Sequence, residues 1–572
     1  MVAVNRQNPR RTFRHCSRIA YNRTFDEFLR NEETAVVITN IRHAAKMRLY
    51  DSENRVCGYA LTNSFGRGVN VTIAYDGSYL TNMVYALPNG SRFAVNLTRN
   101  ASRGELITHR DYSLGTQSVY WYSTGYDLIG RPTNATDSVS LMREWLYNNR
   151  SELAAATIGM NQYGYEYDTI GNRLWSAANA VTNSCAANCL NQYTAVSAGA
   201  NPVYDADGNM TGDGTFAYAY DAENRLVSVT SSAETNGALR VLNAYDHRNR
   251  RIRKIVQCLH STSAPPPAPP TGTDEWQTLE THTFVWDGNN IVLEKVEFAN
   301  GTTRTFEYFW GLDKSGTEQG AGGVGGLLAV SRNGQFYFPT YDNNGNVTKY
   351  IDESGNVVAA YEYDDFGRYI SQTGSLADFF RHRFSTKYYD PETGLYYYDY
   401  RFYSPDWRIW LNRDPMDERG GMNLYSFCNN AQLFKIDADG YSIFNYLPFT
   451  STLLSAIENY IGHIPGSSVT DYSFVSPRDC RCNIVEAEEK CKNKVKMESL
   501  QYAADVLSSA AIARAMDVGI TVLTIRADPR VSAVFAGDGA IGFTINAGAY
   551  AKIMEGANKA KNENCSCSQY GY

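Results

Sequence analysis

The sequence predicts a mainly β protein whose structural unit is a repeated antiparallel hairpin. Three observations predict it: a recurring turn motif, an unusually high tyrosine content, and alternation of polar with aromatic or β-branched residues. The motif is Tyr-Asp, two variable residues, Gly or Asn, and then Asn or Arg. It occurs eight times, with its first residue at Tyr50, Tyr126, Tyr167, Tyr204, Tyr220, Tyr245, Tyr341 and Tyr363.

The fifth position of the motif predicts the turn geometry. Glycine and asparagine are the residues that best tolerate a left-handed backbone, and they alternate at this position. The aspartate at the second position is a typical turn initiator. We therefore predict a strand ending at Tyr, an Asp-initiated turn, and a second strand leaving after Arg or Asn. The fifth residues are Gly130, Gly171, Gly208, Gly345 and Gly367, and Asn54, Asn224 and Asn249.

Tyrosine dominates the aromatic residues, with 42 Tyr against 24 Phe and 8 Trp. Its ring packs on half-buried pleated surfaces while its hydroxyl finds a polar partner. Tyr361 and Tyr363 are two residues apart, as are Tyr218 and Tyr220, so each pair shares one face of a strand. We expect the first tyrosine of each motif to pack on an inner or inter-hairpin surface.

Composition excludes some classes of function. The 53 Lys and Arg against 60 Asp and Glu give a net charge of -7, so the chain has no basic field to attract nucleic acid. No run reaches the roughly 20 apolar residues that span a membrane. The first residues, MVAVNRQNPRRTFRH, contain no apolar core of a signal peptide. The abrupt start of the repeats is typical of the back end of a longer protein.

The cysteines are unevenly distributed. Two Cys-x-Cys pairs bracket about 80 residues of the tail, which favours disulfides in an oxidising compartment and so a secreted or cell-surface protein. A zinc site is an alternative, although the one-residue spacing differs from Cys-x2-Cys, and unpaired thiols are another. The tail holds Cys480, Cys482, Cys491, Cys565 and Cys567; Cys185 and Cys189 are close in sequence, and Cys16, Cys57, Cys258 and Cys428 are isolated.

The pattern along the chain predicts four regions. Residues 1–44 are a lead-in that can be a truncated repeat region, and residues 45–383 are the repeats, interrupted by a proline-rich loop at 261–272. Residues 384–441 form the densest aromatic stretch. Residues 442–572 are a variable, cysteine-containing tail, in which helix formers at 486–517 precede short strands.

A glycine-rich segment, WGLDKSGTEQGAGGVGGLLAV (310–330), precedes the aromatic stretch. A phosphate-binding loop would need Lys-Ser/Thr after the glycines and a helix-forming run, and both are missing. We expect the glycines to permit a close approach of two backbone segments at a strand crossing.

The segments KYYDPETGLYYY, RFYSPDWRIWLNRDP and GGMNLYSF, with a closing Asp-x-x-Gly, resemble the RHS repeat-associated core. With the Tyr-Asp motifs they make residues 45–441 similar to the RHS/YD-repeat family, which includes the Tc-toxin B and C components and the teneurin shell. The resemblance implies a strip of antiparallel hairpins that spirals into a hollow shell, here followed by a small α-containing tail.

The resemblance also implies an aspartyl autoprotease in the core, with Arg401, Asp414 and Asp437 as its catalytic residues and cleavage after Tyr441. Two neighbouring carboxylates do not both ionise easily, so one can hold a proton while the other activates water. The alternative is structural: Asp414 begins a turn with Pro415, and Arg401 only pairs with it.

The end of the core departs from the family pattern. Asn430-Ala431-Gln432 replaces the usual Asn-Asn-Pro, and Asp437-Ala438-Asp439-Gly440-Tyr441 replaces Asp-Pro-x-Gly-Leu. Loss of both prolines is expected to loosen the loop that presents the scissile bond.

Two functions follow. The first is a structural, secreted or cell-surface β-shell that encloses or displays its tail. The second is a polymorphic-toxin-type carrier whose core releases the C-terminal segment by autoproteolysis. Self-cleavage is the sole enzymatic activity expected, since no motif indicates an external substrate, a cofactor or a metal. The expected partners are the protein's own tail inside the shell, an upstream repeat region or capping protein, or a cell-surface partner, without nucleic acid or a membrane span.

Overall fold

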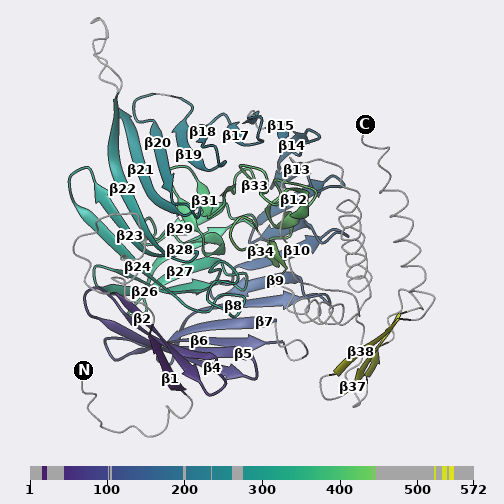
Figure 1. The fold of residues 1–572 in the computed structure, drawn as a ribbon. Coiled ribbons are helices and arrows are strands. Elements are labelled where there is room, and N and C mark those ends of the chain that lie inside the picture. The colour runs from purple at the N-terminus through teal and green to yellow at the C-terminus, as the bar shows by residue number, and fades with distance from the viewer. Residues whose placement is uncertain are drawn as a thin grey trace, which may run out of the picture. The chain divides into compact units, whose positions relative to one another are not determined.

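The computed structural model describes residues 16–21, 44–100, 102, 106–197, 201–233, 235–260, 275–441 and 443–445, and three short strands between 521 and 545. The chain divides into two compact units, Met1–Tyr460 and Ile461–Tyr572. All eight motifs and the aromatic stretch belong to the first unit (Figure 1). The boundary expected between residues 441 and 442 stays a prediction.

The first unit begins with a sheet of fifteen strands, each antiparallel to its neighbours in sequence order. It runs from purple to blue in Figure 1. Its first strand lies in the region expected to be a lead-in. The strands are β1 (Cys16–Tyr21), β2 (Ala45–Asp51), β3 (Val56–Thr62), β4 (Gly68–Asp76), β5 (Tyr79–Ala86), β6 (Arg92–Arg99), β7 (Ile107–Leu114), β8 (Gln117–Tyr126), β9 (Pro132–Asp137), β10 (Met142–Tyr147), β11 (Leu153–Ile158), β12 (Asn161–Tyr167), β13 (Arg173–Ala178), β14 (Val181–Ala187) and β15 (Tyr193–Val196).

A second sheet of fourteen antiparallel strands follows, again in sequence order. The proline-rich loop falls between two of its strands and lies outside the described residues. The strands are β16 (Val203–Tyr204), β17 (Met210–Gly212), β18 (Phe216–Tyr220), β19 (Leu226–Ser231), β20 (Leu239–Tyr245), β21 (Arg251–His260), β22 (Glu275–Asp287), β23 (Asn290–Phe298), β24 (Thr303–Trp310), β25 (Leu327–Arg332), β26 (Gln335–Tyr341), β27 (Val347–Asp352), β28 (Val357–Tyr363) and β29 (Tyr369–Thr373).

The aromatic stretch forms small sheets and tight turns, and we call residues 384–441 the core segment. Its rings stack at close range, as between Tyr403 and Phe427, whose centroids are 4.0 Å apart. Such buried aromatic pairs supply much of the packing energy. Its elements are β30 (Tyr388–Asp390), β31 (Leu395–Tyr398), β32 (Arg401–Ser404), β33 (Ile409–Trp410), β34 (Lys435–Asp437) and the 3-10 turns η1 (Phe384–Thr386), η2 (Asp417–Arg419) and η3 (Phe427–Asn430). Just beyond the core segment, β35 (Ile443–Asn445) pairs with β34.

The core segment is bound to both large sheets by polar contacts. From the second sheet, Arg251 and Lys254 both contact the buried Asp390 carboxylate, with Lys254 Nζ 3.0 Å from Asp390 Oδ1. From the first sheet, Glu152 Oε1 accepts a hydrogen bond of 3.1 Å from Asn430 Nδ2. A buried charge is tolerated when it is paired in this way. The sheets therefore hold the core segment in a defined position.

In the second unit, three antiparallel strands agree with the short strands expected in the tail: β36 (Thr521–Leu523), β37 (Val531–Ala536) and β38 (Ala540–Ile545). The expected helix at 486–517 and the tail cysteines lie outside the described residues. The described part of the chain contains no α-helix. It also offers no helix with the length and apolar character that crossing a membrane requires.

The motif turns have the predicted chemistry. In the first, Asp51 Oδ1 accepts the backbone N–H groups of Glu53 (3.0 Å) and Arg55 (2.9 Å), and Asp51 Oδ2 accepts Arg55 Nε at 2.9 Å. The fifth residue has a left-handed backbone in all eight copies, with φ between 59° and 89°. The prediction of Asp-initiated hairpin turns at the motifs is confirmed.

The first tyrosine of the motif connects successive hairpins. Tyr363 donates its hydroxyl to the carbonyl of Val347 at 2.8 Å, and Tyr245 donates to Leu226 at 2.6 Å. In both cases the acceptor is the residue directly after the preceding motif. All eight tyrosines are buried or half-buried. The predicted packing on a shared surface is therefore confirmed, and the hydroxyl adds a tie between repeats.

Removing this hydroxyl should weaken the array. We expect Tyr363→Phe to lower the free energy of unfolding by about 1 kcal/mol, because a buried hydrogen bond is lost. Tyr220→Phe is the matched control: within the described residues its buried hydroxyl has no hydrogen-bond partner. Denaturant unfolding of both variants should separate them, and equal losses would contradict this role of the hydroxyl.

Additional turns lack the Tyr-Asp signature. Asn148 Oδ1 accepts the backbone N–H groups of Arg150 (2.9 Å) and Glu152 (3.0 Å), and Ser151 has φ 63°. Asp137 initiates a turn of the same kind, with Ser140 at φ 62°, so the long gap from Tyr126 to Tyr167 is filled by further turns rather than by longer hairpins. The sequence signal is an Asp or Asn followed three residues later by Gly, Asn or Ser. Other examples begin at Asn63, Asn188 and Asp352.

Candidate functional site: a buried arginine between two carboxylates

Three different elements bring the predicted site residues together. Arg401 begins β32, Asp414 lies in the loop after β33, and Asp437 ends β34. Arg401 Nη2 is 3.0 Å from Asp414 Oδ2 and 3.2 Å from Asp437 Oδ2. All three residues are buried, with exposures of 2%, 6% and 1%. One guanidinium therefore bridges two carboxylates in a water-poor environment, and the catalytic role of the three stays a prediction.

Packing and hydrogen bonds orient this arginine. The Arg401 guanidinium carbon lies 4.2 Å from the centre of the Trp410 ring, which favours a cation. Arg401 Nε donates a hydrogen bond to the carbonyl oxygen of Gly440. Arginine presents several donors in a rigid plane, so it can contact carboxylates and a carbonyl together. It consequently holds the peptide that precedes Tyr441.

Asp437 initiates the turn that carries Gly440. Its Oδ1 accepts the backbone N–H of Gly440 at 2.7 Å and of Asp439 at 3.3 Å. Burial raises the pKa of Asp437 to about 6, although the Arg401 charge opposes the shift. Near neutral pH this carboxyl can therefore gain or lose a proton, as acid–base chemistry requires.

Asp414 also has a structural role. Its Oδ1 accepts the backbone N–H of Met416 at 2.8 Å, which agrees with the turn expected at Pro415. Its Oδ2 is the atom that contacts Arg401. A Cβ on Gly420 would lie 2.7 Å from Asp414 Oδ2, so glycine leaves room for the carboxylate. The structural and chemical uses of Asp414 are therefore compatible.

A lysine and a glycine hold the Asp437 turn from the other side. Lys387 Nζ donates to the carbonyl oxygens of Ala438 (2.5 Å) and Gly322 (2.8 Å). Gly322 has φ 59°, and a Cβ there would lie 1.7 Å from the Ala438 oxygen. The close backbone approach expected of the glycine-rich segment is present, but its partner is the Asp437 turn rather than a crossing strand. Sequence reasoning missed Lys387, since only its contacts distinguish it.

The turn closes without the prolines of the family pattern. The backbone N–H of Tyr441 donates to Asp439 Oδ1 at 3.0 Å, and the backbone N–H of Tyr400 donates to the Asp439 carbonyl at 3.0 Å. The rings of Tyr400 and Tyr441 lie 5.2 Å apart. These contacts replace part of the rigidity that proline would supply. Ser442, on the far side of the expected cleavage bond, lies outside the described residues.

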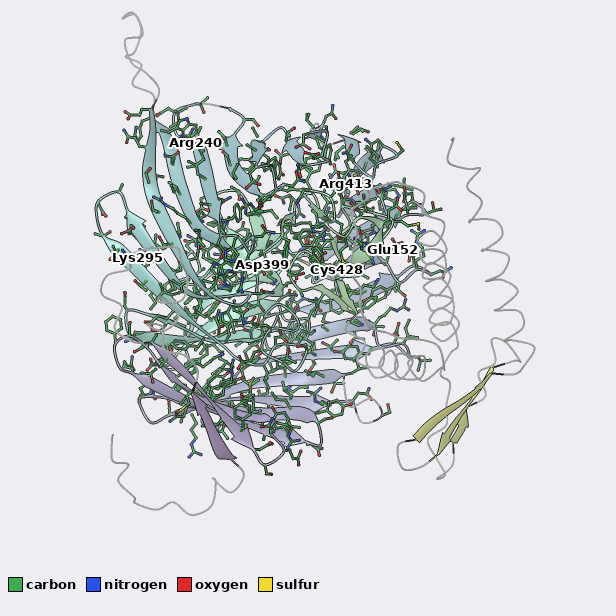
Figure 2. All side chains as sticks on the ribbon, viewed as in Figure 1. Glu152, Arg240, Lys295, Asp399, Arg413 and Cys428 are labelled. Atoms are coloured by element: carbon green, nitrogen blue, oxygen red, sulfur yellow. The ribbon has the colours of Figure 1, made fainter. Side chains whose placement is uncertain are left out.

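A buried thiol lies beside the site. Cys428 is among the central side chains in Figure 2, with a left-handed backbone at φ 50°. Burial and then the nearby charge of Asp437 raise the pKa of this thiol well above its usual value, so it stays protonated. Cys185, Cys189 and Cys258 are also free thiols, whereas Cys57, isolated in the sequence, is disulfide-bonded.

Family comparisons decide the identity. The Teneurin YD-shell model matches residues 11–263, and the RHS Repeat model matches residues 341–376. The chain is an RHS/YD-repeat protein. The matched ranges contain all eight motifs, so the turns and tyrosine ties described above are the chemistry of this family's repeat.

Named relatives of this YD-repeat protein include a nuclease, a toxin and a surface protein. The tRNA3(Ser)-specific nuclease WapA of Bacillus spizizenii is 30% identical over 288 residues, covering 48% of this chain and 11% of the relative. Double-stranded DNA deaminase toxin A of Burkholderia cenocepacia is 26% identical over 330 residues, covering 54% and 22%. Salivary gland surface protein 1 of Aedes aegypti is 35% identical over 116 residues, covering 20% and 3%. The chain thus spans a small part of each relative.

Solved structures share the fold of the YD-repeat protein. The crystal structure of TcdB2-TccC3-Cdc42 has a TM-score of 0.55 at 17% identity, covering 70% of this chain and 21% of that chain. The crystal structure of TcdB2-TccC3 has a TM-score of 0.51 at 16% identity, covering 70% and 22%. The long antiparallel sheets therefore form the shell-like fold of those proteins, and at this identity the likeness concerns the fold alone.

Proposed function

We propose that this YD-repeat protein is a carrier of the polymorphic-toxin type, whose core segment cleaves the chain and releases the C-terminal residues. The relatives named as a nuclease and as a deaminase toxin favour this second function over a purely structural shell. The observation that carries the proposal is Arg401, which contacts two buried carboxylates and the Gly440 carbonyl. Buried ionisable groups gathered around one arginine and one turn are typical of functional sites.

In this proposal each residue has a role. Asp437, whose pKa is raised to about 6, holds a proton and gives it to the departing amine. Asp414 accepts a proton from the attacking water. Arg401 positions both carboxylates and keeps the peptide before Tyr441 in place. Water then adds to the Tyr441 carbonyl, the bond to Ser442 breaks, and the products are a Tyr441 carboxylate and a Ser442 amine.

A cavity in the first unit bears on the enclosing part of the carrier. It has a volume of about 490 Å³ and is lined by residues of both large sheets, including Tyr122 and Trp145 of the first and Tyr341 and Tyr361 of the second. This one cavity is far too small for residues 442–572. We propose that a partner of the shell type or further repeats complete a hollow, spiralling enclosure around the tail in a secreted or cell-surface protein.

A structural surface protein is the second candidate, favoured by the match to Salivary gland surface protein 1. The two candidates differ in one observable, the covalent continuity of the chain. A carrier is cut near Tyr441, whereas a structural shell keeps its tail attached.

Intact mass measured after refolding between pH 5 and pH 8 tests the proposal. We expect two fragments, with the second beginning at Ser442. The rate should be highest below pH 6 and fall above it, since Asp437 then loses the proton that it must donate. If the second fragment instead begins at Tyr441, the cleaved bond is the one that follows the Gly440 carbonyl, which Arg401 contacts. A chain that stays whole throughout this range would overturn the carrier and favour the structural shell.

A further inference from the structure

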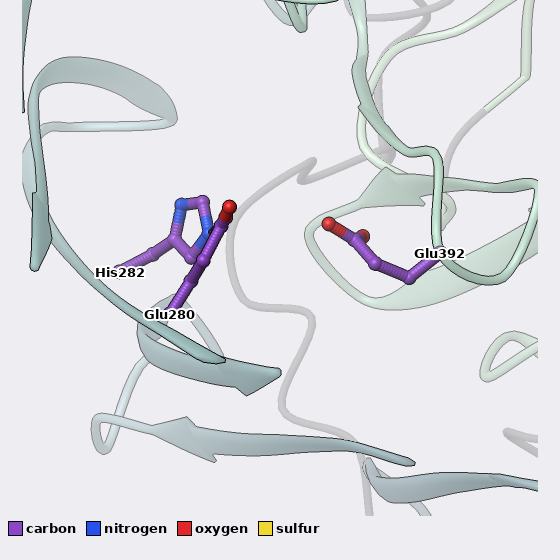
Figure 3. A group of neighbouring side chains, drawn as sticks. All are labelled: Glu280, His282 and Glu392. Carbon is purple, nitrogen blue, oxygen red and sulfur yellow. Dashed lines mark hydrogen bonds and ion pairs between the residues drawn. The ribbon is translucent and has the colours of Figure 1, made fainter. Parts of the chain in front are cut away.

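A second group of ionisable side chains lies outside the Arg401 site. Glu280 and His282 are on β22, and Glu392 is in the turn between β30 and β31 (Figure 3). One ligand atom from each residue lies within 4.8 Å of the other two. The group thus joins the second large sheet to the core segment. Its residue types, an imidazole and two carboxylates, are common metal ligands.

The histidine is oriented by a buried carboxylate. His282 Nδ1 lies 2.7 Å from Glu294 Oε1, and Glu294 also accepts the hydroxyls of Tyr308 (2.6 Å) and Tyr388 (2.5 Å). With two hydroxyls donating to it, Glu294 faces Nδ1 as an acceptor, so Nδ1 carries the hydrogen and Nε2 is left to bind a ligand. Metal-binding histidines are typically oriented in this way.

The other ring nitrogen faces carboxylate oxygens. His282 Nε2 lies 3.0 Å from Glu280 Oε2. With the proton on Nδ1, both of these atoms are acceptors, so a positive charge must lie between them. A proton on Nε2 can satisfy Glu280 alone, whereas a metal ion satisfies Glu280 and Glu392 together.

Charged groups surround the three side chains. Lys254 Nζ contacts both Asp390 Oδ1 and Glu392 Oε2 at 3.0 Å. Arg381 influences the pKa values of Glu280 and Glu392, and the charges of Glu280 and Glu294 influence the pKa of Arg304. With Arg251, these cations equal in number the carboxylates Glu280, Glu294, Asp390 and Glu392. The arrangement of the ligand atoms, rather than an excess of negative charge, therefore supports the site.

We propose that His282, Glu280 and Glu392 bind a divalent transition-metal ion of the Zn²⁺ type. Nitrogen and oxygen ligands bind such ions at roughly 2 Å, with a fourth position left for water. The three ligand atoms lie within 4.8 Å of one another, so Glu392 must move toward the other two side chains to bind the ion. Glu280 retains 29% exposure of its side chain, which gives the ion a path from solvent. The bound ion would fasten the core segment to β22.

Titration of the full chain with Co²⁺ tests the site. The visible absorption bands of Co²⁺ report its coordination, and thiolate ligands add a separate band in the near ultraviolet. We expect one equivalent of Co²⁺ to bind without the thiolate band and to be displaced by Zn²⁺. Glu280→Gln and His282→Gln should each abolish this binding. Glu294→Gln should weaken binding about 10–100-fold by disturbing the ring orientation.

The matched control is His109→Gln, because His109 is half-buried on β7 with its Nδ1 2.6 Å from Ser123 Oγ. It should bind Co²⁺ as the wild type does. Circular dichroism of each variant checks that it folds. Because Glu280 is half-buried, the fold should tolerate the substitution of this ligand. A wild-type protein that shows no visible Co²⁺ bands apart from thiolate binding would overturn the site. So would a folded Glu280→Gln variant that retains these bands. Either result would assign the positive charge beside Glu280 to a proton on His282.

Discussion

The Asp414→Asn chain is expected to remain in one piece under conditions in which the wild type is cleaved. Asparagine keeps the size of the side chain and its turn hydrogen bond to Met416, but it cannot accept a proton from water. Loss of a general base typically slows a reaction by about 10²–10⁴-fold. Arg401 keeps its contact with Asp437, so the core segment should stay folded. Intact mass and gel analysis over time measure the change.

Asp417→Asn is the matched control for this prediction. Asp417 lies three residues further along, its side chain is 68% exposed, and its partner is the exposed Arg413. Exposed pairs of this kind contribute little to stability. The control should be processed at the wild-type rate. Wild-type processing of Asp414→Asn would show that this carboxyl is structural, as the alternative interpretation of the sequence holds.

Gly322→Ala is expected to displace the Asp437 turn. The new Cβ would lie 1.7 Å from the carbonyl oxygen of Ala438 and 2.9 Å from Lys387 Nζ, so backbone must move. The left-handed φ of 59° adds roughly 1–2 kcal/mol for a non-glycine residue. Together these effects should lower the free energy of unfolding by more than 2 kcal/mol and stop self-cleavage. Thermal unfolding and intact mass report the two losses separately.

Gly316→Ala separates the clash from the backbone strain. Gly316 has φ 77° in the same glycine-rich segment, but a Cβ there would meet no atom within 4 Å. This control should lose about 1 kcal/mol and still be cleaved. If the two variants behave alike, the contact between Gly322 and the Asp437 turn does not position the site.

The local chemistry of the motif made the hairpins predictable. Asp at the second position and Gly or Asn at the fifth determine the turn almost entirely within six residues, so sequence suffices there. The turn at Asn148 escaped prediction because it lacks the Tyr-Asp pair. The interruption between β15 and β16, which divides the strip into two large sheets, has no local signal that we recognised.

The site was predictable in its residues but not in its supports. Arg401, Asp414 and Asp437 came from the resemblance of the core segment, and the structure places them together. Lys387 contacts Ala438 of the Asp437 turn, 51 residues away in sequence, and Gly322, 65 residues away. Such contacts depend on tertiary packing, which residue patterns do not encode directly. The same applies to Glu294, which orients His282 from a neighbouring strand.

The tyrosine ties give the repeat array a direction. In each pair the later hairpin supplies the hydroxyl and the earlier hairpin supplies the carbonyl, as with Tyr245 and Leu226. During synthesis the acceptor therefore leaves the ribosome before its donor, at about 5–20 residues per second. Each finished hairpin can serve as the template on which the next one docks. If assembly proceeds from the N-terminal side, each new hairpin covers the edge of the hairpin before it. The core segment would then be added last, onto strands already in place.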